Sequence, residues 1–227
     1  MDKKVKQSIK AAYKEFEKEP MDDYYQKPII GYISRLRVKK IIQELKKAKK
    51  LHNKTVLDAG CEAGYISLKL LKNKSRVIAF DICKPAVEEL QKKLKKNKER
   101  KNIKLFVGEI HKIPLKDNSV DAIVCSEVIE HVPYLSRTIK ELNRVLRPGG
   151  VLIITFPNEK LRKFLYPFIK LFGVDTSVEK EVTLHDYKLK DIVKECKKLL
   201  KISKVDSIPP IFKLTHIIIC KKRVIDE

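Results

Sequence analysis

The sequence predicts an α/β protein whose mostly parallel, doubly wound sheet is covered by helices on both faces. The first observation is a series of short apolar runs of strand length, near residues 54–58, 76–80, 103–107, 120–125 and 151–156. The second is the set of helix-like stretches that separate them, near residues 64–73, 84–98 and 134–146. Strands that alternate with helices form a parallel sheet, because each crossover helix returns the chain to the same edge.

The chain begins with helical patterns ahead of this alternation. Residues 3–18 and 35–50 carry apolar positions at helical spacing on a basic background. Between them lies a proline-bounded, tyrosine-rich linker, residues 20–28. We interpret residues 1–50 as an N-terminal helical cap and residues 51–227 as the α/β domain.

After the fifth predicted strand the alternation stops. Residues 161–172, LRKFLYPFIKLF, are strongly aromatic for a chain with 7% aromatic residues. We expect an apolar insertion near residues 158–185 that forms a lid or an apolar pocket; an ordinary helix packing its apolar face is the alternative. A helix near 187–200 and strands near 201–207 and 214–221 complete the chain.

The most informative segment is VLDAGCEAGY, residues 56–65. It predicts a buried strand that breaks into a glycine loop and reopens as a helix. The next strand ends on Asp81, 21 residues past Gly60. This order is typical of the cofactor half of a Rossmann-like unit. Taken singly, Asp58 or Asp81 could instead cap the turn or helix that follows it.

The charges of this loop indicate which cofactor it holds. A dinucleotide would place its anionic pyrophosphate over the turn, where helix-end N–H groups favour negative charge. Here Asp58 stands at the strand tip and Glu62 lies inside the loop. A cofactor that carries an ammonium and a sulfonium would be attracted instead. The sequence therefore favours S-adenosylmethionine over NAD.

Residues 54–157 resemble the class I S-adenosylmethionine-dependent methyltransferases, most closely the group that contains the quinone-biosynthesis and many small-molecule enzymes. VLDAGCEAGY resembles the first family motif, AFDIC the second, VGEIHKIPLKDNSVDAIVCSEVIEHV the third and fourth, and LNRVLRPGGVLIITFPN the last. The chain has Glu62 where glycine is common and Glu109 where aspartate is usual. The resemblance implies a seven-stranded sheet whose last strand is antiparallel.

The resemblance also implies contacts to the cofactor. Asp58 and the backbone at Gly60 would hold the methionine end, with Gly64 closing the same loop. Asp81 would accept hydrogen bonds from both ribose hydroxyls, a role that its place at a strand end also suits.

At the adenine end the resemblance implies three further residues. Glu109 would lie near the adenine amine, and Ile82 and Ile110 would sandwich the ring.

On the acceptor side, His131 is the best candidate for a general base. Methyl transfer from a sulfonium needs alignment, exclusion of water and, where a proton must leave, a base. His131 follows the fourth predicted strand, at the carboxyl edge where such sheets bind ligands. In some relatives an E-x-x-E-H run binds a divalent metal; Glu127, Glu130 and His131 match it. In others the acids cap the next helix, and we expect no metal ligand here.

The acceptor itself is predicted less directly. We expect a small-molecule or lipid-like acceptor, with a methyltransferase that acts on RNA and a non-catalytic cofactor-binding protein as alternatives. The net charge of +22 indicates either a surface for RNA or an anionic membrane, or a lysine-rich bias of the kind seen in heat-adapted proteins. No arginine cluster or aromatic platform accompanies the lysines. An NAD-dependent oxidoreductase is disfavoured by Asp58 and Glu62.

The remaining features indicate cellular location. The five cysteines are scattered without CxxC spacing, as in reduced thiols. The chain starts without an apolar leader, and its longest apolar runs are strand-sized. We expect a cytoplasmic protein with no transmembrane segment.

Overall fold

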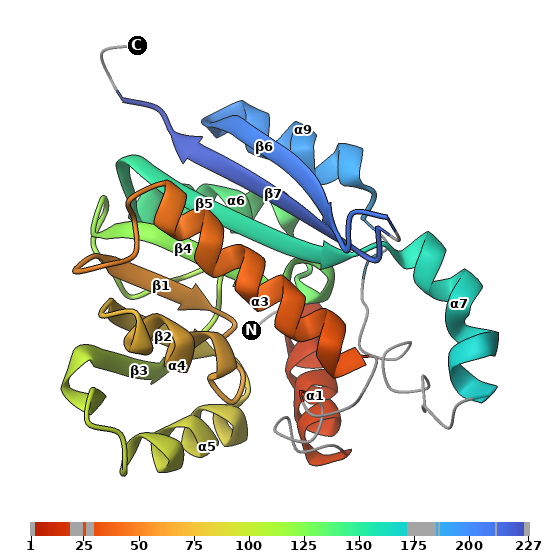
Figure 1. Cartoon of the computed structure of the whole chain (residues 1–227), viewed down its shortest axis with the longest axis horizontal. Helices are drawn as coiled ribbons and strands as arrows, with labels where there is room; N and C mark the ends of the chain where they lie inside the picture. The colour runs from red at the N-terminus through yellow and green to blue at the C-terminus, as the bar shows by residue number, and fades with distance from the viewer. Residues whose placement is uncertain are drawn as a thin grey trace.

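The computed structural model describes residues 3–18, 25, 30–171, 185, 187–211 and 213–224. Seven strands in this part of the chain form one sheet in the order β3-β2-β1-β4-β5-β7-β6 (Figure 1). Their bounds are β1 Thr55–Ala59, β2 Arg76–Asp81, β3 Ile103–Val107, β4 Val120–Ser126, β5 Leu146–Pro157, β6 Leu200–Ile208 and β7 Thr215–Lys222. Strands β1 to β5 pair in parallel, whereas β7 pairs antiparallel with both β5 and β6. The predicted Rossmann-like sheet, with its last strand antiparallel, is confirmed.

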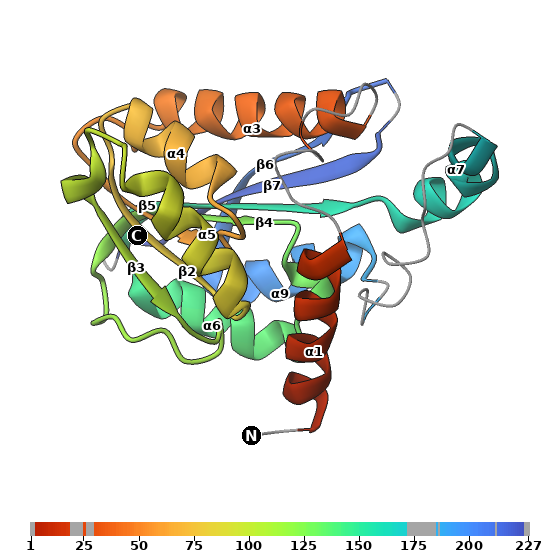
Figure 2. The same cartoon turned by 90° about the horizontal axis from the view of Figure 1, so that it is seen from below.

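Helices cover both faces of this sheet (Figure 2). On one face lie α3 (Ile30–Lys47), α4 (Tyr65–Lys72) and α5 (Lys84–Leu94), and on the other α6 (Leu135–Val145) and α9 (Leu189–Leu199). Successive residues of β1 supply both layers: Val56 packs with the first group of helices and Leu57 with the second. This alternation follows from the two-residue period of a strand, and it produces two buried cores of aliphatic side chains.

Two helices lie near the carboxyl edge of the parallel strands. Helix α1 (Lys3–Lys18) packs beside α5 and reaches the turn after β4, and α7 (Glu159–Leu171) extends away from the sheet beyond β5 (Figures 1 and 2). The predicted linker, residues 20–28, lies outside the described residues except for Tyr25. The predicted insertion, residues 158–185, is described as far as Leu171 and at His185.

The structure differs from the predicted element bounds most clearly in three places. The helix predicted over 35–50 is α3, which runs from Ile30 to Lys47. The helix predicted over 84–98 ends at Leu94, because Leu94 is its last buried apolar side chain and the following residues are lysine-rich. Residues 147–150, which lie between the helix predicted near 134–146 and the strand predicted near 151–156, belong to β5, which begins at Leu146. Its extra residues are absorbed by a register shift between Val120 and Ala122, with Gly149 at φ 67°. Among the described helices, none has the length and apolar character needed to cross a bilayer.

Candidate functional site

The glycine loop between β1 and α4 is tightly packed against two neighbouring segments. The N–H groups of Gly60 and Cys61 both donate to the Phe80 carbonyl, each at 2.9 Å. Gly60 has φ 81°, which favours glycine, and a Cβ added there would lie 2.2 Å from Val128 Cγ2. The loop therefore follows the end of β2 closely and lies directly under the residue that follows β4 by two positions.

Glu62, the residue that stands where the family usually has glycine, also has a left-handed backbone. Its φ is 51°, a conformation that costs an ordinary residue roughly 1–2 kcal/mol. The Glu62 N–H donates to Asp81 Oδ2 at 2.9 Å. This hydrogen bond helps to hold the loop in its shape despite the missing glycine.

Asp81 lies half-buried at the end of β2 and organises the segments around it. Its Oδ2 accepts the Glu62 N–H and its Oδ1 accepts the Cys83 N–H, both at 2.9 Å. Burial raises the pKa of Asp81, and hydrogen bonds from the backbone of Cys83, Glu62 and Ile82 partly oppose that rise. An ionised carboxylate offers about four acceptor positions, so acceptor capacity remains for a ligand. The bond to Cys83 also orders the residue just before α5, although Asp81 does not itself cap the helix.

Asp58 is 1% exposed, and its Oδ2 accepts the Ser67 hydroxyl from α4 at 2.6 Å. Burial raises the pKa of Asp58 to about 7; the hydrogen bond from Ser67 opposes this, and the nearby charge of Asp81 adds to it. Two neighbouring acids therefore face the same loop, and a cation placed there would favour their ionised forms.

The residues predicted for the adenine end lie beside Asp81. The Gly108 N–H donates to the Asp81 carbonyl at 3.0 Å, which brings the segment after β3 against the end of β2. Ile110 is 7% exposed and packs in the core, whereas Ile82 and Glu109 are partly exposed. The structure thus brings the predicted cofactor residues to the adjoining carboxyl ends of β1, β2 and β3.

His131 lies in a short 3₁₀ turn, Ile129–His131, just after β4. Its side chain is 29% exposed, and its Nε2 lies 3.9 Å from Glu130 Oε1. Two distant segments cover this turn. The Ser8 hydroxyl of α1 donates to the His131 carbonyl at 2.8 Å, and the His185 N–H donates to the Glu130 carbonyl at 3.2 Å. The turn is therefore roofed by the N-terminal helix and by the segment before α9.

His185 and Tyr187 precede α9, and His185 contacts the turn after β4 directly. The His185 and Tyr187 rings stack with centroids 5.0 Å apart. Burial lowers the pKa of His185, and the charge of Lys4 lowers it further.

Arg37 was not predicted as a site residue, yet it contacts this turn. Arg37 Nη1, from α3, lies 3.3 Å from Glu127 Oε2, and the Arg37 side chain is 9% exposed. The Thr155 hydroxyl donates to Glu127 Oε1 at 3.1 Å. In the sequence Arg37 is one basic residue among 51, so no pattern sets it apart.

The E-x-x-E-H side chains do not form a ready set of metal ligands. Both carboxylate oxygens of Glu127 have partners of their own, Arg37 and Thr155. Glu130 is buried, and its Oε2 has no hydrogen-bond partner in the described part of the chain. Burial raises the pKa of Glu130, and the charge of Glu127 adds to the rise. Within the described residues, no three His, Cys, Asp or Glu side chains gather closely enough to hold a metal ion.

Comparison with known proteins agrees with this arrangement. Residues 57–154 match the family model of a methyltransferase domain. The chain is 28% identical to an uncharacterised protein of Methanocaldococcus jannaschii over 94% of its own length and 85% of that protein's. It is 28% identical to a ubiquinone biosynthesis O-methyltransferase of Coxiella burnetii, over 68% of this chain and 63% of that one.

Solved structures share the fold. The magnesium protoporphyrin IX methyltransferase of Synechocystis, solved with bound S-adenosylhomocysteine, superimposes with a TM-score of 0.67 at 21% identity. The match covers 84% of each chain.

Proposed function

Because the chain is a class I S-adenosylmethionine-dependent methyltransferase, we propose that its acceptor is a small or lipid-like molecule. The observation that carries this proposal is the roof over the turn after β4, where Ser8 and His185 bond to its carbonyl groups. A roofed site suits a compact acceptor better than a folded macromolecule. The O-methyltransferase of ubiquinone biosynthesis, a relative over 68% of this chain, supports the same class.

The cofactor residues are assigned by the same proposal. Asp81 accepts hydrogen bonds from the ribose hydroxyls, and Asp58 with the backbone at Gly60 holds the methionine end. Gly64 lets the loop turn into α4 at φ 87°.

At the adenine end, Glu109 accepts from the adenine amine, and Ile82 and Ile110 contact the two faces of the ring. Glu62, which stands where the family usually has glycine, is compatible with cofactor binding, because its left-handed backbone keeps the shape of the loop.

The methyl donor supplies an electrophilic carbon on a positively charged sulfur. The protein's part is to align the acceptor with that carbon, to exclude water and to take the acceptor's proton. A ring nitrogen of His131 takes the proton, and Glu130, whose Oε1 lies 3.9 Å from His131 Nε2, stabilises the resulting positive charge. Helix α1, as part of the N-terminal helical cap over residues 1–50, keeps water out.

A transfer assay tests the proposal. The purified protein is incubated with S-adenosylmethionine labelled in its methyl group and, in separate reactions, with phenolic small molecules, isoprenoid phenols and total RNA. Label transferred to a phenolic or isoprenoid acceptor supports the proposal, and transfer to RNA alone contradicts it. His131→Ala is expected to lower turnover about 10²–10⁴-fold, the usual contribution of a general base, with cofactor affinity unchanged.

A further inference from the structure

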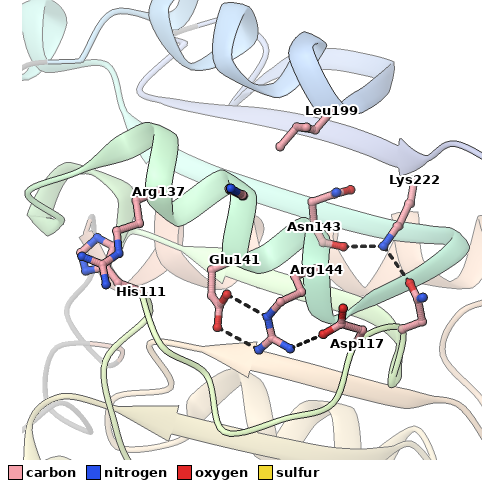
Figure 3. A pocket seen from close by; sticks show the side chains of 10 residues that line it. His111, Asp117, Arg137, Glu141, Asn143, Arg144, Leu199 and Lys222 are labelled. Carbon is pink, nitrogen blue, oxygen red and sulfur yellow. Dashed lines mark hydrogen bonds and ion pairs between the residues drawn. The ribbon is translucent and has the colours of Figure 1, made fainter.

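A hollow lies on the face of the molecule covered by α6 and α9, apart from the residues assigned above (Figure 3). It is a groove of about 520 Å³, within the range of sites that hold small ligands. It is lined by the segment after β3, by α6 and by the ends of α9 and β7, with the residues His111, Asp117, Asn118, Arg137, Lys140, Glu141, Asn143, Arg144, Leu199 and Lys222.

Arg144, one of the basic residues of the groove, has a structural role. All five N–H donors of Arg144 are used: they bond to Glu141, to Asp117 and to the carbonyls of Leu115 and Ile113 at 2.6–2.9 Å. Arg144 thereby fastens the segment before β4 to α6 and pairs with both carboxylates of the groove, Asp117 and Glu141 (Figure 3).

Lys222 differs from Arg144, because all of its hydrogen-bond partners are uncharged groups. Its three N–H donors bond to Asn118 Oδ1 and to the carbonyls of Asn143 and Leu146, at 2.7–2.8 Å. These partners satisfy its hydrogen bonds and leave its positive charge uncompensated by direct contact with a carboxylate. Lys222 is therefore a source of positive potential at one end of the groove.

Arg137 and Lys140 add positive charge along α6. They lie one turn apart, are exposed, and form no ion pair with any carboxylate among the described residues. Four cationic side chains line the groove against two carboxylates, an excess of two positive charges when His111 is neutral. The groove therefore favours an anion.

One unused acceptor indicates a hydroxyl group beside that anion. His111 is 8% exposed, its ring is hydrogen-bonded to the Tyr134 backbone, and its Nε2 has no partner in the described chain. Burial lowers the pKa of His111, with the charge of Arg137 adding to this, so the ring is neutral and Nε2 acts as an acceptor. A buried acceptor of this kind is satisfied by an O–H donor.

We propose that this groove binds a sugar phosphate, with Arg137 and Lys140 on the phosphate and His111, at the Arg137 end of the groove (Figure 3), accepting from a sugar hydroxyl. The ligand is a free sugar phosphate or the backbone of an RNA strand, which share this chemistry. None of the lining residues is Phe, Tyr or Trp, so the groove offers no ring on which a base could stack. Recognition is of the ribose and phosphate, independent of base sequence.

Binding of four probes to the full chain tests the proposal: ribose 5-phosphate, 2-deoxyribose 5-phosphate, and an RNA and a DNA oligonucleotide of one sequence. We expect each ribose probe that binds to do so roughly tenfold more tightly than its deoxy counterpart, the effect of one lost hydrogen bond. Binding of ribose 5-phosphate identifies a free ligand as sufficient, and binding of the RNA alone identifies the strand as the source. Equal binding of ribose and deoxyribose probes, or none by any probe, overturns the proposal.

Variants locate the binding in the groove. Arg137→Ala with Lys140→Ala should weaken both probe classes at least tenfold and reduce the dependence of affinity on salt. His111→Ala should remove the preference for ribose. Lys190→Ala with Lys194→Ala, two exposed lysines of α9 outside the groove, is the control and should change neither. Binding of S-adenosylhomocysteine verifies that each variant is folded. Unchanged binding in the Arg137 and Lys140 variant also overturns the proposal.

Discussion

Arg37 Nη1 lies 3.3 Å from Glu127 Oε2, so a guanidinium of α3 pairs with the first acid of the run that follows β4. Glu127 has a left-handed backbone, with φ 54°, and the next residue, Val128, packs over Gly60. The ion pair therefore links the N-terminal helices to the loop proposed to hold the cofactor.

Arg37→Ala should loosen that loop. Removing one member of a largely buried pair leaves the other charge uncompensated; because Glu127 is 21% exposed, we expect a loss of about 2 kcal/mol, below the usual cost for fully buried pairs. Affinity for S-adenosylhomocysteine should fall several-fold. Chemical unfolding and calorimetry measure the two effects. Lys39→Ala, an exposed change on the same helix, is the control, and an equal response of both variants would contradict the link.

Treatment with EDTA should leave methyl transfer unchanged. Arg37 and Thr155 occupy the two carboxylate oxygens of Glu127, so a cation from α3 already stands where a divalent metal would need a ligand. The rate of methyl transfer is compared before and after chelation and after adding Mg²⁺ back. Loss of activity on chelation that Mg²⁺ restores would show that the E-x-x-E-H run does bind a metal.

Affinity for S-adenosylhomocysteine should rise as the pH rises from 6 to 7.5. The pKa of Asp58 is raised from 3.8 to about 7, so below pH 7 the carboxyl is protonated and cannot pair with the ligand's ammonium. The slope is at most tenfold per pH unit. Calorimetry at a series of pH values measures it, and Asp58→Asn should be insensitive to pH in this range. A pH-dependence that persists in Asp58→Asn would assign it to another group.

The same shift affects the free energy of unfolding. The folded protein holds the Asp58 proton more tightly than the unfolded chain, so this group's contribution to stability is full below about pH 3.8 and is lost as the pH rises to about 7. Asp58→Asn should therefore become more stable relative to the parent as the pH rises through this window. Denaturant unfolding at pH 5 and pH 7.5 compares them, and an equal difference at both pH values would count against the raised pKa.

Glu62→Gly should stabilise the fold. Glycine adopts the left-handed conformation at residue 62 without steric cost, and we expect a gain of about 1 kcal/mol after its greater loss of chain entropy. Glu62→Ala retains the strain while it removes the carboxylate, so it should give no comparable gain. Denaturant unfolding of both variants measures the difference. Equal stabilisation by alanine would mean that charge, and not backbone strain, is relieved.

The sheet could be predicted from the sequence because the apolar runs of β1, β2 and β4 are short, continuous and separated by helical patterns. Asp81 could be predicted at a strand end, since both its distance from Gly60 and its acidic side chain are local signals. The predicted helix extends four residues beyond α5, because lysine favours helices and the sequence does not show that packing against the core stops after Leu94. Contacts between distant segments could not be predicted, because no local sequence pattern indicates them. Examples are the contacts of Arg37 with Glu127 and of Ser8 with His131.

Calorimetric titration of the parent and Asp81→Ala with S-adenosylhomocysteine is the most direct measurement, because it tests whether the ligand's ribose rests on the carboxylate at the end of β2. We predict binding by the parent and a loss of about 1–3 kcal/mol in Asp81→Ala, the cost of leaving buried polar groups unpaired. Asp81→Asn, which keeps the size of the side chain and one oxygen, should lose less. An affinity in Asp81→Ala equal to that of the parent would contradict the proposed cofactor site.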